Sequence, residues 1–246
     1  NIDVESRIAA VVAGSHHDSP FKGLVRLKLN VPNLSASGYI TEVTIRQLIE
    51  GGRGGTPGWR TDDEFYMHYV SPRFPDREEW EAWTSGKWQE YWFAFWSEVR
   101  DFYNSESVSG NLWSSEQSNL TKAVTMRLLQ ELFITKSIER ARAAESLRAV
   151  LSGRFSEAET ELIVAEEVQK NALPESVDEF RRTVRENFLG KGVPVRVFEK
   201  PWVNSLDDEA GISELRMELT KAADLTASGQ RYRAQNKAVF SVEDRD

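Results

Sequence analysis

The chain has 246 residues, enough for one large domain or two small ones with a substantial core. Its net charge of −8 disfavours a non-specific grip on DNA, because that grip needs Lys and Arg to neutralise phosphates. With no cysteine, the sequence excludes disulfides, thiolate catalysis and Cys-ligated metal sites, and it fits a reducing cytoplasm.

The residue pattern of the N-terminal part predicts a helix, a strand and a second helix, in that order. The first helix is expected over residues 2–13. Apolar residues that alternate with basic ones predict a half-buried strand over 24–31, as part of a small β element such as a hairpin. Thr41 is placed as the N-cap of the second helix, which the glycines from Gly51 onward would end.

A glycine-rich run follows over residues 51–58, with five glycines and one proline. It has some character of a phosphate-binding loop, and Arg53 and Arg60 are candidates to meet an anion. However, it lacks the Gly-Lys-Ser/Thr ending and does not lead from a strand into a helix. A mobile connector is therefore the preferred interpretation.

The next segment is an aromatic helix that holds five of the eight tryptophans: Trp80, Trp83, Trp88, Trp92 and Trp96. Asp76 and Glu79 resemble a capping box at its start, and Gly86 favours a break into pieces 78–84 and 87–104. Helical spacing places four charged residues opposite the aromatic face: Lys87, Glu90, Glu98 and Asp101. Acidic neighbours would repel phosphates, so we interpret the helix as a core element rather than a base-stacking surface.

The remaining sequence is predicted to be helical. Expected helices cover residues 119–151 and 213–225. Between them, Ser156 caps a helix that ends near residue 171, and Ser176 caps a helix that ends before Gly190. The prediction is a mainly α, multi-helix domain with a small β element near the N-terminus. Residues 1–152 form its first region, and 153–246 form a helical extension packed on it within the same domain.

Ligand-type side chains occur in two places. His16, His17 and Asp18 are adjacent, but consecutive side chains rarely share one metal, so we expect no metal ion and no cofactor there. The acids 207–209 are the basis of an alternative, a metal-dependent enzyme with a carboxylate site. No histidine or lysine is placed to complete such a site, and we predict no catalytic residue.

Basic residues give the candidates for nucleic-acid contact. They fall into two clusters, Lys22, Arg26 and Lys28 around the predicted strand, and Arg231, Arg233 and Lys237 near the C-terminus. The second cluster lies in an acid-free segment with Tyr232 and two amides, a mixture that suits contacts to a phosphate backbone. An ordinary solvent-facing edge is the alternative interpretation of both clusters.

Three stretches occur in a characteristic order along residues 2–135. They are Asp18-Ser19-Pro20-Phe21-Lys22-Gly23-Leu24-Val25 followed by Tyr39-Ile40-Thr41, the aromatic helix that ends near Tyr103, and Asn119-Leu120-Thr121-Lys122-Ala123-Val124 leading into Leu128-Leu129. This succession resembles the C-terminal helical half of DGQHR-domain proteins, the DndB-like group.

The resemblance implies an association with bacterial DNA modification and phage defence, such as DNA phosphorothioation. The N-terminal half of those proteins resembles the ParB/sulfiredoxin-type fold and carries an Asp-Gly-Gln-His-Arg motif. Gly229-Gln230-Arg231 is the nearest string here and does not match it, so chemistry tied to that motif is carried onto no residue. The resemblance implies the helical half of a larger protein, which agrees with Asn1 in place of Met.

The sequence therefore predicts a non-catalytic helical module of a DGQHR/DndB-like protein that contacts DNA or a partner protein. The alternatives are a pure protein–protein interaction or oligomerisation module and the metal-dependent enzyme. Expected partners are DNA, other defence or modification proteins, or a second copy. No membrane partner is expected, because no apolar run approaches the roughly 18 residues of a membrane helix.

Overall fold

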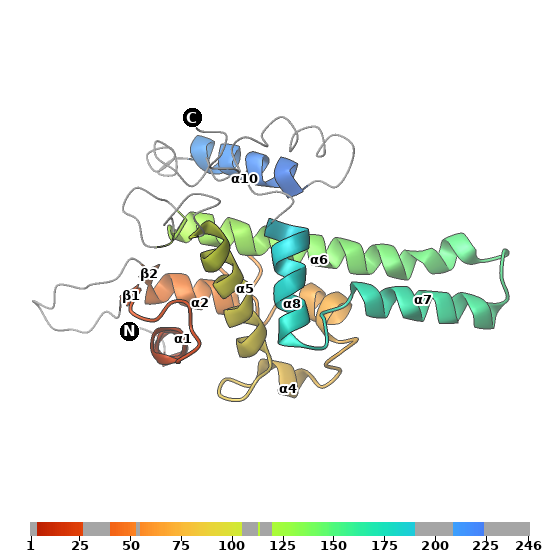
Figure 1. The fold of residues 1–246 in the computed structure, drawn as a ribbon, viewed down its shortest axis with the longest axis horizontal. Helices are drawn as coiled ribbons and strands as arrows, with labels where there is room; N and C mark the ends of the chain where they lie inside the picture. Colours follow the sequence, from red (N-terminus) through yellow and green to blue (C-terminus); the bar gives the residue numbers. More distant parts are fainter. Residues whose placement is uncertain are drawn as a thin grey trace, which may run out of the picture.

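The computed structural model describes residues 4–26, 40–52, 55–104, 113, 120–189 and 209–223. The described part is mainly α, as predicted (Figure 1). Its α-helices are α1 (Val4–Ser15), α2 (Glu42–Glu50), α3 (Asp63–Phe65), α4 (Arg77–Glu81), α5 (Trp88–Tyr103), α6 (Ala123–Leu151), α7 (Glu157–Asn171), α8 (Val177–Thr183) and α10 (Glu209–Ala223). Two π-helical segments, η1 (Tyr66–Val70) and η2 (Val184–Leu189), continue α3 and α8.

The β element near the N-terminus is present but is not a hairpin. Strand β1 (Val25–Arg26) pairs in parallel with β2 (Ile40–Thr41), with Val25 opposite Ile40. Parallel strands need a connection that crosses back over their length, whereas a hairpin joins antiparallel strands. The alternation of residue types predicts an extended backbone, but it carries no information about the direction of the partner strand.

Side-chain caps begin several helices where the sequence predicts them. The Thr41 hydroxyl accepts a hydrogen bond from the backbone N–H of Thr44 at the start of α2. Ser156 and Glu159 form a reciprocal capping box at α7, and Ser176 caps α8. These local hydrogen bonds satisfy backbone donors of the first helical turn, which is why the starts can be located from sequence.

The aromatic segment consists of two helices, as the position of Gly86 predicts. A Cβ atom at Gly86 would lie only 2.3 Å from the Ala82 carbonyl oxygen and 2.4 Å from that of Trp80. The indole Nε1 of Trp88 donates to the same Ala82 oxygen over 2.9 Å. The chain between α4 and α5 is therefore a tight turn in which the backbone closely approaches itself.

The tryptophans of α5 form the centre of the core, as predicted. Trp88, Trp92 and Trp96 are fully buried. The Trp92 indole Nε1 donates to Oε1 of Gln130 on α6 over 3.0 Å. Gln130 in turn donates through Nε2 to the Leu48 carbonyl of α2 over 2.6 Å. One buried amide thus connects three helices inside an otherwise apolar core.

The prediction that Glu98 faces solvent is wrong. Its side chain is only 2% exposed and is covered by α8 and η2. Arg185 donates through Nε to Glu98 Oε2 over 2.7 Å, and Arg181 Nη1 lies 3.5 Å from Oε1. Burial of this carboxylate is tolerated because two guanidinium groups compensate its charge. The other charged positions expected opposite the aromatic face, such as Glu90 and Asp101, are exposed.

Helices α6 and α7 lie side by side and project from the rest of the molecule as an arm (Figure 1). Arg148 of α6 pairs with Glu161 of α7 within the arm. Helix α10 contacts α6, where Arg216 pairs with Glu131. In the ranges that the structure describes, no helix combines the length and apolar character needed to cross a membrane.

Candidate anion-binding cavity

Most of the basic residues predicted to contact nucleic acid lie outside the described residues: Lys28, Arg231, Arg233 and Lys237. Lys22 is exposed in the turn that precedes β1. Arg26 belongs to β1, but its side chain is outside the described part. Contact of these two basic clusters with nucleic acid therefore stays a prediction.

Arg60, which follows the glycine-rich run and is a candidate to meet an anion, forms its contacts within the protein. Its guanidinium donates through Nε to Glu50 Oε1 over 2.9 Å and through Nη1 to the Glu81 carbonyl over 2.7 Å. It also lies 4.1 Å from the ring centroid of Trp83. A Cβ atom at Gly58 would lie 2.3 Å from the Glu50 carbonyl carbon, so this turn is packed against α2. Arg60 is thus a structural cation rather than an anion ligand.

The histidine pair offers ligand atoms but not a shared coordination point. Possible ligand atoms of His16, His17 and Asp18 lie within 4.8 Å of one another. The two imidazole rings are stacked with centroids 4.6 Å apart, and His17 Nε2 lies 2.9 Å from Asp18 Oδ2. Stacked rings direct their nitrogen lone pairs side by side, so binding one metal would require the rings to turn apart.

The carboxylate group at 207–209 is only partly described. Asp207 and Asp208 lie outside the described residues, and Glu209 is exposed at the start of α10. Acidic residues at this position interact favourably with a helix dipole. What the structure describes of this cluster therefore adds no support to a metal-dependent enzyme.

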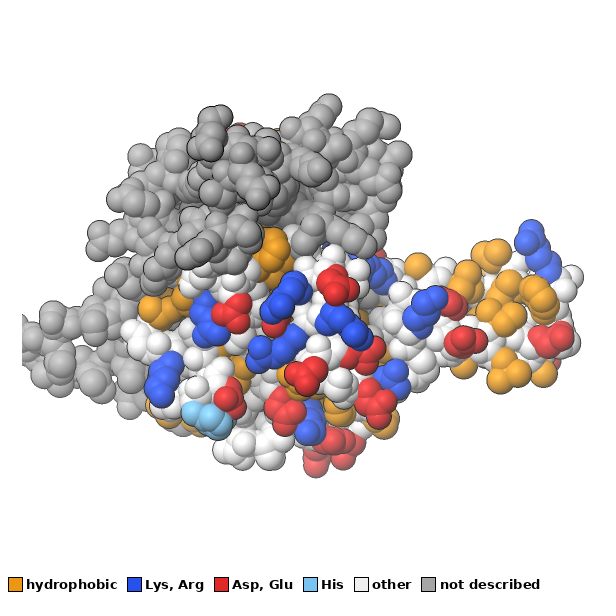
Figure 2. Space-filling view, in the orientation of Figure 1, with side chains coloured by type: hydrophobic (Ala, Val, Ile, Leu, Met, Phe, Trp, Pro, Cys, Tyr) orange, Lys and Arg blue, Asp and Glu red, His pale blue; other side chains and the backbone are white. Residues whose placement is uncertain are grey.

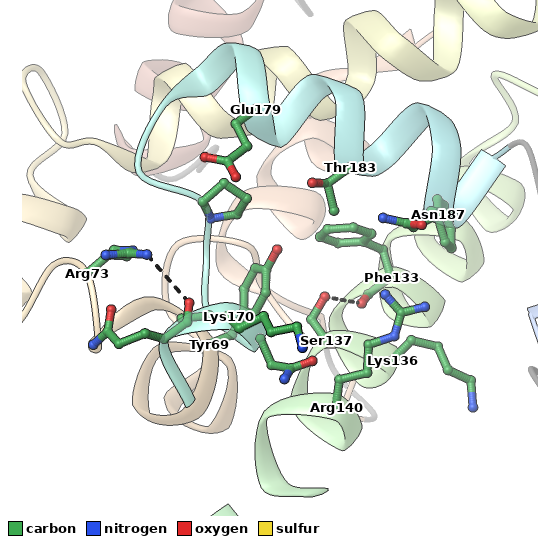
Figure 3. Close-up of a pocket in the computed structure, with 15 residues that line it drawn as sticks. Tyr69, Arg73, Phe133, Lys136, Ser137, Arg140, Lys170, Glu179, Thr183 and Asn187 are labelled. Atoms are coloured by element: carbon green, nitrogen blue, oxygen red, sulfur yellow. Dashed lines mark hydrogen bonds between the residues drawn. The ribbon is translucent and has the colours of Figure 1, made fainter. Parts of the chain in front are cut away.

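A cavity of about 330 Å³ lies between η1, α6, the end of α7 and the α8–η2 segment (Figure 3). Its lining contains four cationic side chains, Arg73, Lys136, Arg140 and Lys170. Glu179 is the one carboxylate among the lining residues described. In Figure 3, Arg73 lies on one side of the cavity, and Lys136 and Arg140 lie on the opposite side. The local excess of positive charge contrasts with the net charge of −8 of the chain.

The inner end of this cavity combines aromatic rings with a phenolic hydroxyl. Tyr69, Phe133 and Phe188 line it and are each less than one-tenth exposed. Burial raises the pKa of Tyr69, although the nearby Arg140 and a side-chain hydrogen bond with Ser137 act in the opposite direction. Tyr69 is therefore a neutral O–H donor at pH 7. Hydroxyl and amide groups complete the lining: Ser137, Thr183, Gln169, Asn171 and Asn187.

The four cations differ in how far the protein already neutralises them. Lys136 pairs with Glu139 over 2.6 Å, and Lys170 pairs with Glu167 over 3.1 Å. Both are solvent-accessible pairs one helical turn apart, which contribute little stabilisation. Such pairs can exchange their carboxylate for a ligand anion at small cost.

Arg73 and Arg140 have no carboxylate partner within the described part of the chain. Arg73 donates through Nη2 to the Gln169 carbonyl over a long 3.5 Å, and its Nε is buried without a hydrogen-bond partner. Leaving a buried donor without an acceptor costs about 1–3 kcal/mol. These two guanidinium groups are therefore the donors best placed to gain from an incoming anion.

The walls of the cavity are held in place by backbone contacts between distant segments. The N–H of Leu173 donates to the Tyr69 carbonyl over 2.7 Å. Tyr91 on α5 donates its hydroxyl to the Pro174 carbonyl over 2.8 Å. These bonds fix the linker between α7 and α8 against η1 and α5, so the cavity is shaped by rigid elements rather than by one loop.

Sequence reasoning did not identify this site. Lys136 and Arg140 are one turn apart on α6, and that spacing is the one local signal that could have drawn attention to them. Arg73 and Lys170 lie far from them in the sequence and are brought close by the fold.

No protein-family model, no curated protein and no solved structure matches this chain. The roles of the lining residues therefore rest on the geometry of the cavity alone.

Proposed function

We propose that this chain is a non-catalytic helical module of a DGQHR/DndB-like DNA-modification or phage-defence protein, and that it contacts DNA by holding a phosphate group in the cationic cavity. The observation that carries the proposal is the pair Arg73 and Arg140, which face one cavity with no carboxylate partner in the described chain. Guanidinium groups present forked donors that match phosphate oxygens.

The negative charge of the whole chain sets the expected character of this contact. A net charge of −8 opposes the approach of DNA, so attraction has to come from a local positive field such as that of the cavity. Contacts through a few cations release few counterions, which gives modest affinity and a measurable but shallow dependence on salt. Binding is therefore expected at low ionic strength first.

A mobility-shift assay with 5′-phosphorylated duplex and single-stranded DNA at low salt tests the proposal. We expect a shift that Arg73→Glu and Arg140→Glu weaken at least tenfold. Arg154→Glu is the matched control, because Arg154 is exposed in the turn between α6 and α7 and brings the same change of charge. The absence of any shift, or equal weakening by all three variants, would contradict DNA contact through the cavity.

The apolar end of the arm favours a second candidate function, contact with a partner protein. Val150, Phe155 and Leu162 are 57%, 47% and 73% exposed near the turn that joins α6 to α7. Figure 2 shows hydrophobic side chains on the surface of the arm far from the body of the molecule. Exposed apolar groups that gather in one place are typical of interaction surfaces.

Light scattering over a range of concentrations tests self-association through the arm. We expect the mean mass to rise with concentration and Leu162→Asp to abolish the rise. Met217→Asp is the control, because Met217 is exposed on α10, outside the arm. A chain whose mass is independent of concentration would argue against pairing of two copies.

A further inference from the structure

We infer that the cavity accepts a phosphate monoester, as carried by a free nucleotide or by the end of a nucleic-acid strand, rather than a phosphodiester within a strand. The inference rests on the proposed function, in which the cavity holds a phosphate, and it names the form of that phosphate. Three properties of the cavity carry it: shape, charge and the distribution of neutral polar groups.

The first property is the closed inner end. The cavity holds about 330 Å³, and Tyr69, Phe133 and Phe188 line it as nearly buried side chains. A phosphate inside a strand continues into sugars on both sides, so proteins that bind internal phosphates use an open groove that tracks the backbone. A cavity lined by segments from η1, α6, α7 and η2, with these nearly buried rings at its inner end, is suited instead to a group that enters end first.

The second property is the amount of positive charge. Among the lining residues that the structure describes, four cationic side chains stand against one carboxylate, that of Glu179. A phosphate monoester carries about −1.5 to −2 charges at pH 7 and presents three strong acceptor oxygens, whereas a diester carries one charge. Arg73 and Arg140 approach from opposite sides (Figure 3). A monoester therefore offers these guanidinium groups more negative charge and one more terminal acceptor oxygen than a diester does.

The third property is the position of the neutral polar groups. Thr183 and Asn187 belong to the α8–η2 wall, which crosses above the cations in Figure 3. They supply donors and acceptors in a place where a sugar or base attached to the bound phosphate would lie.

The test compares two single-stranded oligonucleotides of one sequence, with a 5′-phosphate or a 5′-hydroxyl, and it compares thymidine 5′-monophosphate with thymidine. We expect the phosphorylated strand to bind at least tenfold more tightly in a titration. We also expect the monophosphate, and not thymidine, to raise the melting temperature, because a ligand that binds the native state stabilises it. Arg140→Glu should remove both preferences, and Arg154→Glu should keep them.

Comparing the phosphorylated strand with the monophosphate distinguishes the two sources of a monoester. Tighter binding of the phosphorylated strand than of the monophosphate identifies a strand end, and the reverse order identifies a free nucleotide. Arg140→Lys retains the charge but not the forked donors, so we expect it to weaken the preference for the monoester without abolishing it. An unchanged circular dichroism spectrum of this variant excludes misfolding as the cause of the weaker binding.

The inference and the proposed function can fail separately. Equal affinity for the two strands, weakened equally by Arg140→Glu, would overturn the monoester inference and leave DNA contact through the cavity in place. Binding of the monophosphate that depends on Arg140, without any shift of DNA, would support the monoester and overturn DNA contact. No response to either phosphate would overturn the inference.

Discussion

Glu98 on α5 accepts two close contacts from Arg185 on η2, with Arg185 Nε at 2.7 Å and Nη2 at 2.6 Å from the same carboxylate oxygen. The carboxylate is 2% exposed, whereas the Arg185 side chain is 61% exposed. An exposed cation therefore neutralises a buried anion at the junction between the aromatic helix and the segment that forms one wall of the cavity. The pair couples the position of η2 to the core.

Arg185→Ala should lower the free energy of unfolding by about 1–3 kcal/mol, because the buried Glu98 carboxylate loses its best donors. Arg181, at 3.5 Å, compensates only in part. Equilibrium denaturation with urea measures the change. Arg182→Ala is the control, because Arg182 is exposed on α8. Equal stabilities of the two variants would show that the pair is not stabilising.

Gln130→Leu should destabilise the core although leucine is more apolar. The Trp92 indole N–H loses its partner, whereas the Leu48 carbonyl keeps the hydrogen bond from the Trp59 N–H. A buried donor left without an acceptor costs about 1–3 kcal/mol. Denaturation measures the loss, and a red shift of tryptophan emission would report altered packing around Trp92. Thr135→Val, at an exposed position of the same helix, should change little. A neutral Gln130→Leu variant would refute the role of this amide.

Gly86→Ala should destabilise the protein by about 1–3 kcal/mol or more, the cost of forcing an extra carbon into a packed site. The neighbouring atoms at 2.3 Å and 2.4 Å are backbone carbonyl oxygens, which cannot move independently. Gly14→Ala is the matched control, because its Cβ would meet Val25 at an ordinary 3.5 Å inside α1. That variant should gain up to about 1 kcal/mol from helix propensity. A lower melting temperature for Gly86→Ala than for Gly14→Ala would confirm the close approach at Gly86.

Alkaline pH should unfold the protein above pH 10. Burial raises the pKa of Tyr91 to about 12 from the ordinary 10.0, and burial also raises the pKa of Tyr69 and Tyr103. A raised pKa in the folded state means that the stabilisation is complete below the ordinary pKa and is lost as pH rises through the folded one. Stability should therefore fall between pH 10 and about 12.

Absorbance at 295 nm, recorded together with far-ultraviolet circular dichroism, measures this transition. The buried tyrosines should ionise together with the loss of helix. Ionisation of all tyrosines near pH 10 with full retention of helix would contradict their burial. Tyr91→Phe should also lose the hydrogen bond to the Pro174 carbonyl, and it provides a variant with one fewer buried titrating group.

Much of the local structure is readable from the sequence, because its causes are local. Ser156 and Glu159 cap α7 through bonds within one turn, and Gly86 marks a turn that no other residue fits. The aromatic spacing of α5 likewise predicts its role in the core. In contrast, the direction of the β1–β2 pair depends on a partner strand, and alternation along one strand does not contain that information.

The sequence by itself determined a mainly α chain, where several of its helices begin and end, and a tryptophan-rich helix at its centre, since capping and periodicity act over a few residues. Only the tertiary structure decided that Glu98 is buried, that Arg60 faces inward, and that Arg73 and Arg140 meet at one cavity. Charges far apart in the chain acquire a shared role only when the helices that carry them pack together, because electrostatic attraction and hydrogen bonding act over a few ångströms of space.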